Sequence, residues 1–310
     1  MQKGTSDMNH WPRSRGAIVR SGLVIVVVAA CAYLFGLYSY PRGLWPVSLL
    51  RDVKNTTLSI GVYDEYGRLV AYPGKAEVPC PLQAADTAVI LAIGQSNVAN
   101  HGTQRITTRH PGAAINYFGG KCYAAASPLL GATQDGGEFL TRLADDLIDS
   151  GLYRNVVIVS SGIGGTAISR WRRHEYLNEM LLKTFKTLPP GYKVTEVIWH
   201  QGESDFMEAT STSDYVASFE SLVDTLVENG VDAPIYISVS TKCGTPWTAD
   251  NPTAAAQRAV VDNKRILLGA DTDTLLLPED RHAGCHYSET GQKKTAASYA
   301  EAIKLSRQAR

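Results

Sequence analysis

Residues 88–97 read AVILAIGQSN, an apolar run that ends in a polar turn. An uninterrupted apolar run of this length is typical of a strand buried on both faces, as in parallel sheets covered by helices. The change from apolar to polar residues at Gly94 marks the carboxyl end of that strand. In open parallel sheets ligands bind at this end, so the stretch places Ser96 where a functional group is expected.

The rest of the chain repeats this pattern of strands and helices. Apolar runs predict further strands at 155–160, 194–200, 234–240 and 274–277. Amphipathic spacing predicts helices at 138–150, 175–187, 213–229, 252–267 and 288–307. Strands that alternate with helices indicate an α/β fold with a parallel sheet covered on both faces. Before it, alternating residues around Gly67 predict a β-hairpin at 58–72.

Composition excludes two broad classes of protein. Thirty basic and thirty acidic residues among 310 leave no formal net charge, which argues against a generally basic nucleic-acid binder. A hydrophobic share of 44% is too high for an intrinsically disordered chain.

The N-terminal region predicts a membrane segment. No charged residue occurs between Ser21 and Pro41, and about 20 apolar residues span a bilayer as a helix. Basic residues precede the segment, which favours a cytoplasmic tail and a domain on the extracytoplasmic side. We expect a tail at 1–20, an anchor at 21–40, a linker with the hairpin at 41–85 and the catalytic domain at 86–310.

Two other interpretations of this segment stay open. A cleaved signal peptide has a shorter apolar region followed by a cleavage site. Residues 28–31, Val-Ala-Ala-Cys, are similar to a bacterial lipoprotein signal. The apolar run continues past Cys31 to Leu37, which favours the uncleaved anchor.

Three polar segments that follow predicted strands offer groups for acyl transfer. Ser96 at a strand-to-helix turn is a candidate nucleophile, although serine is also a common helix cap. Residues 161–166, SGIGGT, offer backbone N–H groups of Gly164 and Gly165 for an oxyanion. Residues 199–205, WHQGESD, offer the Gln201 amide as a further oxyanion donor and the Glu203 carboxylate to orient a histidine.

The candidate base lies before the last helix. Residues 284–291 read GCHYSETG, and His286 there is suited to remove the proton from Ser96. No spaced set of cysteines and histidines suggests zinc, and no metal or organic cofactor is expected.

These segments together resemble the SGNH hydrolases, and among them the sialate O-acetylesterase-like (SASA) carbohydrate esterases. The matching blocks are GQSN at 94–97, GGTAISRW at 164–171, WHQGE at 199–203 and the histidine block at 285–291. The resemblance implies a three-layer flavodoxin-like fold and removal of acetyl groups from sugars. It implies Ser96 as nucleophile, Gly164 or Gly165 and Gln201 as oxyanion donors, and His286 as base. Apart from the resemblance, Asn97, Arg170 and Trp171 are candidate substrate contacts. Arg170, with Arg172 and Arg173, is suited to bind an acidic sugar such as a sialic or uronic acid, and a solvated basic helix start is the alternative.

One position departs from the family pattern. The family usually has aspartate three residues before the histidine, whereas this chain has Ala283. The base can instead be oriented by Glu203, by Asp280 or by a backbone carbonyl, and we favour Glu203.

The cysteines bear on the same loop. Apart from Cys31, four of the five cysteines are left, and four cysteines allow three pairings. We favour a Cys243–Cys285 disulfide, which would hold the His286 loop rigid where the aspartate is missing. Four free buried thiols are the alternative.

The sequence therefore predicts a membrane-anchored serine esterase that acts on an acetylated carbohydrate, with the bilayer contacted through residues 21–40. Two other functions stay open. One is a degenerate esterase fold that binds glycan without cleaving it, and Ala283 is its main support. The other is acetyl transfer or maturation in a surface-polysaccharide system.

Overall fold

The computed structural model describes residue 24 and residues 27–36, 61–244 and 246–309, in two compact units, Met1–Ser59 and Ile60–Arg310. In the first unit, residues 27–36 are helical and their apolar side chains are mostly exposed. No helix among the described residues is both long and apolar enough to span a bilayer. Of the predicted anchor, 21–40, residues 21–23, 25–26 and 37–40 lie outside the described residues.

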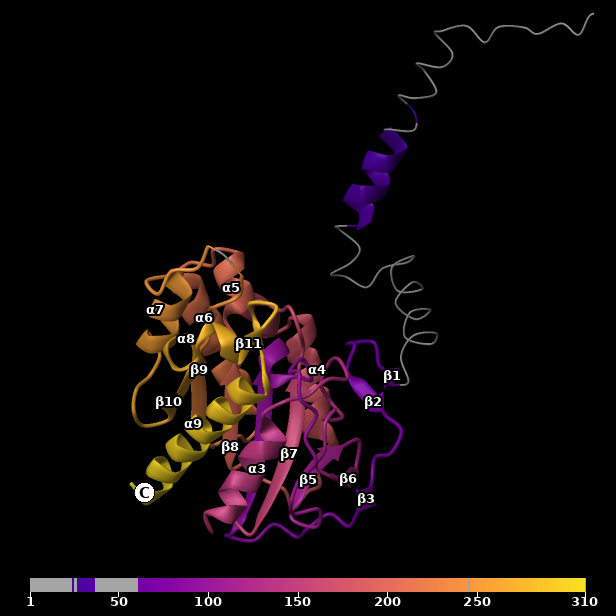
Figure 1. Ribbon diagram of the computed structural model, residues 1–310, viewed down its shortest axis with the longest axis vertical. Helices are drawn as coiled ribbons and strands as arrows, with labels where there is room; N and C mark the ends of the chain where they lie inside the picture. Colours follow the sequence, from indigo (N-terminus) through magenta and orange to yellow (C-terminus); the bar gives the residue numbers. More distant parts are fainter. Residues whose placement is uncertain (1–23, 25–26, 37–60, 245, 310) are drawn as a thin grey trace, which may run out of the picture. The chain divides into compact units, whose positions relative to one another are not determined.

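The second unit is built on an eight-stranded sheet in the order β10-β9-β8-β4-β7-β5-β6-β3. Six neighbouring strands run parallel, from β10 through to β5 (Figure 1). β6 pairs antiparallel with β5, and β3 pairs antiparallel with β6. The bounds are β3 (Glu77–Val78), β4 (Thr87–Gly94), β5 (Ala114–Phe118), β6 (Lys121–Ala124), β7 (Asn155–Gly162), β8 (Glu196–His200), β9 (Ile235–Val239) and β10 (Ile266–Asp271). The prediction of a mostly parallel α/β sheet is confirmed.

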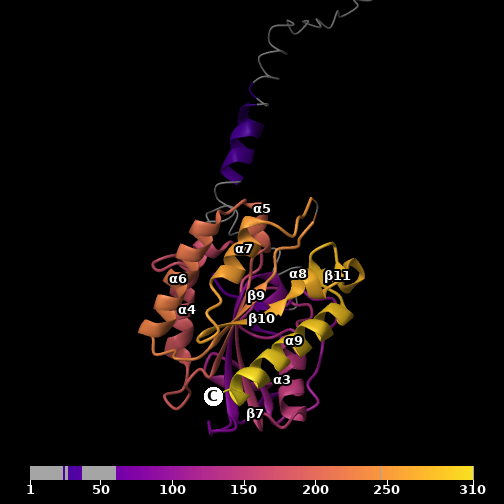
Figure 2. The same cartoon turned by 90° about the vertical axis from the view of Figure 1, so that its left-hand side faces the viewer.

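Helices cover both faces of this sheet (Figure 2). The bounds of the longer helices are α3 (Leu140–Asp149), α4 (Tyr176–Thr187), α6 (Thr212–Glu228), α7 (Pro252–Ala259) and α9 (Glu289–Gln308). Along β4, Val89, Leu91 and Ile93 pack into the core under α4 and α6. The alternate residues of the same strand pack into a second core under α3 and α9. Side chains of a strand alternate between faces, so this one apolar run supplies both cores.

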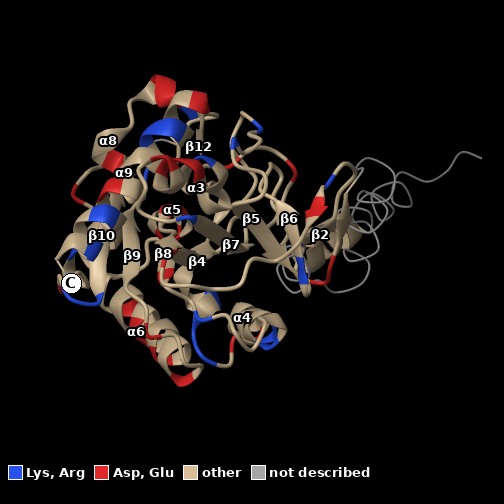
Figure 3. Ribbon diagram, turned by 90° about the horizontal axis from the view of Figure 1, so that it is seen from below, with Lys and Arg blue, Asp and Glu red and all other residues tan. Residues whose placement is uncertain are grey.

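Most charged residues lie outside these cores, although a few acidic residues, among them Glu196 of β8, are buried. Figure 3 shows most of the charged residues on the outer helices and loops, whereas β4 and β7 carry none. Because β4 and β7 carry no charged residue, the sequence shows them as continuous apolar runs.

Three parts of the sheet differ from the sequence prediction. The last parallel strand is β10 at 266–271, not 274–277, where a short helix α8 (Thr272–Leu275) lies instead. The strands β5 and β6 were not predicted. The expected linker also contributes β3, which pairs with β6, while β1 (Val62–Tyr63) and β2 (Leu69–Ala71) form the predicted hairpin.

The topology places a switch point at β4. The chain adds β7 and β5 on one side of β4 and β8, β9 and β10 on the other. Loops therefore diverge at the carboxyl end of β4, and such a crevice is where open α/β sheets bind ligands.

Gly94 permits the close approach of strands at that end. Its φ is +134°, and a Cβ there would lie 2.1 Å from the His200 carbonyl oxygen of β8. The next residue, Gln95, donates its N–H to the same oxygen at 3.0 Å. Only a residue without Cβ fits between the two strands.

Replacing Gly94 with alanine should therefore destabilise the fold by about 3 kcal/mol or more. Thermal unfolding should show a melting temperature lower by roughly 6–12 °C. Gly191→Ala is the control, because a Cβ at Gly191 meets nothing within 4 Å. A Gly94→Ala protein as stable as the control would contradict this reading of the strand contact.

Candidate active site

Ser96 lies at the switch point, as the strand-end rule predicts. It is the first residue of the 3₁₀ turn η1 (Ser96–Val98), directly after β4. The residue is 4% exposed. Among the described residues neither its hydroxyl nor its backbone N–H has a hydrogen-bond partner. Both groups are therefore available to a substrate.

A tight hairpin brings His286 to this turn. β11 (Arg281–His282) pairs with β12 (His286–Tyr287), and Cys285 N–H donates to the His282 carbonyl at 3.1 Å. Ala283 and Gly284 between them have φ of +51° and +72°. Positive φ at both central residues is typical of a type I′ turn. The family's aspartate position is thus the tip of a two-residue turn.

Two hydrogen bonds join the hairpin to the nucleophile segment. The Asn97 side chain donates through Nδ2 to the Cys285 carbonyl at 3.3 Å. Thr103 N–H donates to the Tyr287 carbonyl at 3.0 Å. The residues on either side of His286 are therefore bound to the stretch that begins with Ser96.

The structure does not place Glu203 or Asp280 against His286. Glu203 Oε1 accepts from Asn97 Nδ2 at 2.6 Å and from Ser240 Oγ at 2.9 Å, and its Oε2 has no partner among the described residues. Asp280 Oδ2 instead accepts from Lys294 Nζ at 2.6 Å and from Leu277 N–H at 3.0 Å. The prediction that Glu203 orients His286 is corrected accordingly, because Glu203 binds Asn97 and Ser240 instead.

The Gln201 amide is also committed elsewhere. Its Nε2 donates to the Thr166 carbonyl at 3.1 Å and to the Asp205 carboxylate, and it lies 3.2 Å from Gln95 Oε1. These partners leave no hydrogen for an oxyanion, so this prediction is corrected as well. The cause is the sharp turn at Gly202, where α5 (Glu203–Met207) begins and the strand no longer stays extended.

Of the two glycines, Gly165 is the better donor. Gly164 N–H donates to Thr133 Oγ1 at 2.9 Å. Gly165 N–H has no partner among the described residues, and its φ of +67° suits glycine.

Two predicted substrate contacts are internal. Asn97 is 3% exposed and Trp171 is fully buried, with its ring packed edge-on against Trp199. Asn97 instead links Glu203 to the His286 loop, as above. Arg170 lies half-buried on η2 (Ile168–Trp171), at the surface of the same loop region.

Burial and charge set the ionisation of the candidate base. Desolvation, and secondarily the nearby His282, lower the pKa of His286 below its usual value. The ring of His101 lies 5.0 Å from that of His286, centroid to centroid. Burial first, and the charge of His286 second, lower the pKa of His101 to about 3. His101 is therefore neutral near neutral pH.

Beneath the turn, Glu203 is fully buried. Desolvation raises its pKa to about 7, against the opposing effect of its hydrogen bonds. A carboxyl group that titrates near neutral pH under the nucleophile turn is typical of a functional site.

The structure contains two disulfides. Cys243 is bonded to Cys285, the pairing favoured from the sequence, and Cys80 is bonded to Cys122. Among the described residues no group of three or more His, Cys, Asp or Glu side chains is placed to hold a metal ion.

Sequence reasoning missed His101 and Arg281. His101 lies five residues after Ser96, beyond the GQSN block, and no motif marks it. Arg281 lies beside the histidine block, and its buried guanidinium donates to the Cys285 carbonyl at 3.2 Å. Neither residue follows from spacing alone, because each acts through packing between distant segments.

Comparisons with known proteins agree with this site. A sequence profile of the family described as carbohydrate esterase, sialic acid-specific acetylesterase (SASA), matches residues 86–304. A probable carbohydrate esterase from Arabidopsis thaliana is 33% identical over 70 residues, which are 22% of this chain and 27% of that protein. The match thus spans about a quarter of that relative's length.

Solved structures share the fold. A protein from Arabidopsis thaliana superposes with a TM-score of 0.56 at 18% identity, covering 71% of this chain and 98% of that one. The structure of NanS superposes with a TM-score of 0.51 at 18% identity, covering 72% of this chain and 98% of that one.

The profile covers most of the chain, including all four blocks that converge at Ser96. The chain belongs to the SASA family of carbohydrate esterases.

Proposed function

We propose that this protein removes O-acetyl groups from a carbohydrate, with Ser96 as nucleophile and His286 as general base. The observation that carries the proposal is the link between the two loops: Asn97, next to Ser96, binds the carbonyl of Cys285, next to His286. Family membership supports the ester chemistry. Among the described residues neither the Ser96 side chain nor the His286 side chain has a hydrogen-bond partner, and catalytic hydrogen bonds often form only when substrate binds.

The reaction follows from these groups. His286 takes the hydroxyl proton of Ser96 as Oγ attacks the acetyl carbonyl, and the oxyanion is stabilised by the N–H groups of Ser96 and Gly165. The imidazolium of His286 then gives its proton to the departing sugar oxygen, leaving an acetyl-serine. Water, activated by the same histidine, attacks this ester and releases acetate.

The sugar is the finer part of the proposal. Arg170 on η2 is the proposed contact for the sugar, including an acidic sugar such as sialic acid.

The membrane anchor at 21–40 is also part of the proposal, with the esterase domain on the extracytoplasmic side. It is supported by the charge-free stretch Ser21–Pro41 and by the exposed apolar residues of the helical segment 27–36.

Ser96→Ala and His286→Ala should each lower kcat for an acetylated sugar by about 10⁴-fold or more, since each removes a reacting group. Release of acetate is the measurement. Ser150→Ala and His110→Ala are controls at surface positions and should keep wild-type turnover. Binding of glycan without turnover in the wild type would instead support a degenerate binding module.

The pH profile should identify the base. A base works only when neutral, so kcat/KM should rise with pH through the pKa of His286, and the midpoint should lie below about 6.5. His282→Gln removes a neighbouring positive charge, so it should raise the pKa of His286 and move the midpoint to higher pH. The Glu203→Gln variant tests whether the buried carboxyl causes the pH dependence instead. A midpoint of kcat/KM near pH 7 that disappears in this variant would assign the pH dependence to Glu203 and not to His286.

Anchoring should appear as retention of the full chain in membranes washed with alkaline carbonate. A variant with Val27→Arg and Phe35→Arg should be lost from the membrane pellet, because each arginine costs about 2.5–3.5 kcal/mol at the centre of a spanning helix. Recovery of the unaltered chain in the wash would refute the anchor.

A further inference from the structure

His286 lacks the side-chain support that a catalytic histidine usually has. Among the described residues no carboxylate oxygen lies within ion-pair distance of its ring, and the ring makes no hydrogen bond. A base that is free to rotate would seldom face Ser96. The His101 ring lies beside it, at 5.0 Å between centroids, and the remaining support comes from contacts that hold its backbone.

Three contacts converge on the residue before it. The sulfur of Cys285 is bonded to Cys243. The Cys285 carbonyl accepts from Asn97 Nδ2 at 3.3 Å and from Arg281 Nη1 at 3.2 Å. The last bond comes from the first residue of the same hairpin.

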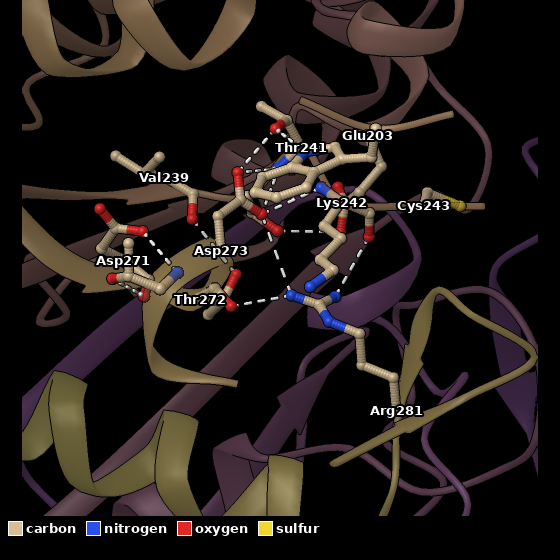
Figure 4. A network of polar contacts seen from close by, with 12 residues as sticks. Glu203, Val239, Thr241, Lys242, Cys243, Asp271, Thr272, Asp273 and Arg281 are labelled. Carbon is tan, nitrogen blue, oxygen red and sulfur yellow. Dashed lines mark hydrogen bonds and ion pairs between the residues drawn. The ribbon is translucent and has the colours of Figure 1, made fainter. Parts of the chain in front are cut away.

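The Arg281 guanidinium joins three segments of the chain. Besides the Cys285 carbonyl, its Nη1 donates to the Lys242 carbonyl at 3.2 Å, and its Nη2 donates to the Thr272 carbonyl at 2.8 Å. Figure 4 shows the side chain reaching from its strand toward Lys242, Thr272 and Asp273. A planar fork of donors suits such divided contacts, which a lysine cannot reproduce.

A buried cation of this kind needs a counter-charge. The Arg281 side chain is 1% exposed, and Asp273 Oδ1 lies 3.9 Å from its Nη2. Asp273 in turn accepts from the N–H groups of Thr241 and Lys242, at 2.9 and 2.9 Å through Oδ1. The loop after β9 is therefore fixed by Asp273, and Arg281 and the disulfide both tie the His286 hairpin to that loop.

We propose that Arg281 is a positioning residue for His286, acting through the Cys285 carbonyl together with the Cys243–Cys285 disulfide. This support takes the place of the family's aspartate, because position 283 of this chain is alanine. The inference rests on the proposed function, in which His286 is the base.

The chain offers matched controls for both parts of this support. Arg68 is also a buried arginine. The whole residue is 9% exposed against 8% for Arg281, and its side chain is 11% exposed against 1%. It binds Asp64 and Thr184, which belong to the hairpin region and α4. The two disulfides each span a sequence separation of 42 residues. Because the loop lengths are equal, the chain-entropy model expects equal losses of stability when either is removed.

The experiment compares kcat and KM of the full chain for an acetylated sugar across these variants. Arg281→Gln should lower kcat by about 10–100-fold with KM nearly unchanged, because it misplaces the base and not the substrate. Arg281→Lys should recover part of this loss. Arg68→Gln should cost stability alone, with kcat per folded molecule as in the wild type.

The disulfides give a second comparison. Cys243→Ser with Cys285→Ser should lower kcat, whereas Cys80→Ser with Cys122→Ser should lower only the melting temperature. Turnover of an aryl acetate provides a further readout. Because the aryl leaving group needs no proton, its turnover in the affected variants should fall less than that of the sugar ester.

The outcomes separate the two proposals. No turnover by the wild type would refute the proposed function itself. An active wild type in which Arg281→Gln matches Arg68→Gln would overturn the positioning role. If Arg281→Gln does not fold, the disulfide pair decides, and equal kcat in both cysteine double variants would overturn it.

Discussion

The site depends on the close contact between β4 and β8 at their carboxyl ends. Gly94 has no Cβ, and the Gln95 N–H can therefore reach the His200 carbonyl at 3.0 Å. This contact ends the parallel pairing of β4 at the same level as that of β8, and the pairing of β4 with β7 ends there too. Three loops consequently leave the sheet at one edge, and the nucleophile turn is the middle one. Without this contact the groups gathered there would lie at different heights along the sheet.

A buried polar network lies beneath that edge. Fully buried Glu203 accepts from Asn97 and Ser240, and fully buried His200 lies within 3.0 Å of the Tyr299 hydroxyl and 2.7 Å of the Tyr287 hydroxyl. Burial lowers the pKa of His200 to about 3, so this ring is neutral and serves as a hydrogen-bonding group. Unpaired buried polar groups cost free energy, so a network of this kind stabilises one arrangement of its loops over others. Its role is to hold the turn and the hairpin in register, since Tyr287 follows His286 directly.

The sequence predicted what local patterns control and missed what packing controls. The apolar run of β4 and its glycine identified the strand, its end and the place of Ser96. The apolar run at 274–277 predicted a strand, but it is not one. Two of its leucines, Leu275 and Leu277, are exposed in α8 and the following turn, so this run does not mark buried structure. The last parallel strand, β10, contains Gly269, where a Cβ would lie 2.2 Å from the Tyr299 ring. The need for glycine there is set by Tyr299 of α9, so the local sequence does not reveal it. Likewise, Gln201 and Asn97 have side chains suited to a substrate, but their partners, Asp205 and Glu203, take them into the interior.

Support through the backbone also changes the chemistry of the base. A carboxylate beside a histidine stabilises the imidazolium and raises its pKa. His286 has no such partner among the described residues, and desolvation lowers its pKa. Its imidazole is therefore a weaker base toward Ser96, but a larger fraction of it is neutral in acidic solution. The corresponding imidazolium is a stronger acid toward the departing sugar oxygen. A sugar alkoxide is a poor leaving group, so protonating it is the step that gains most from this shift. The missing aspartate thus moves the balance of one residue from proton acceptor toward proton donor, provided that the hairpin keeps the ring in place.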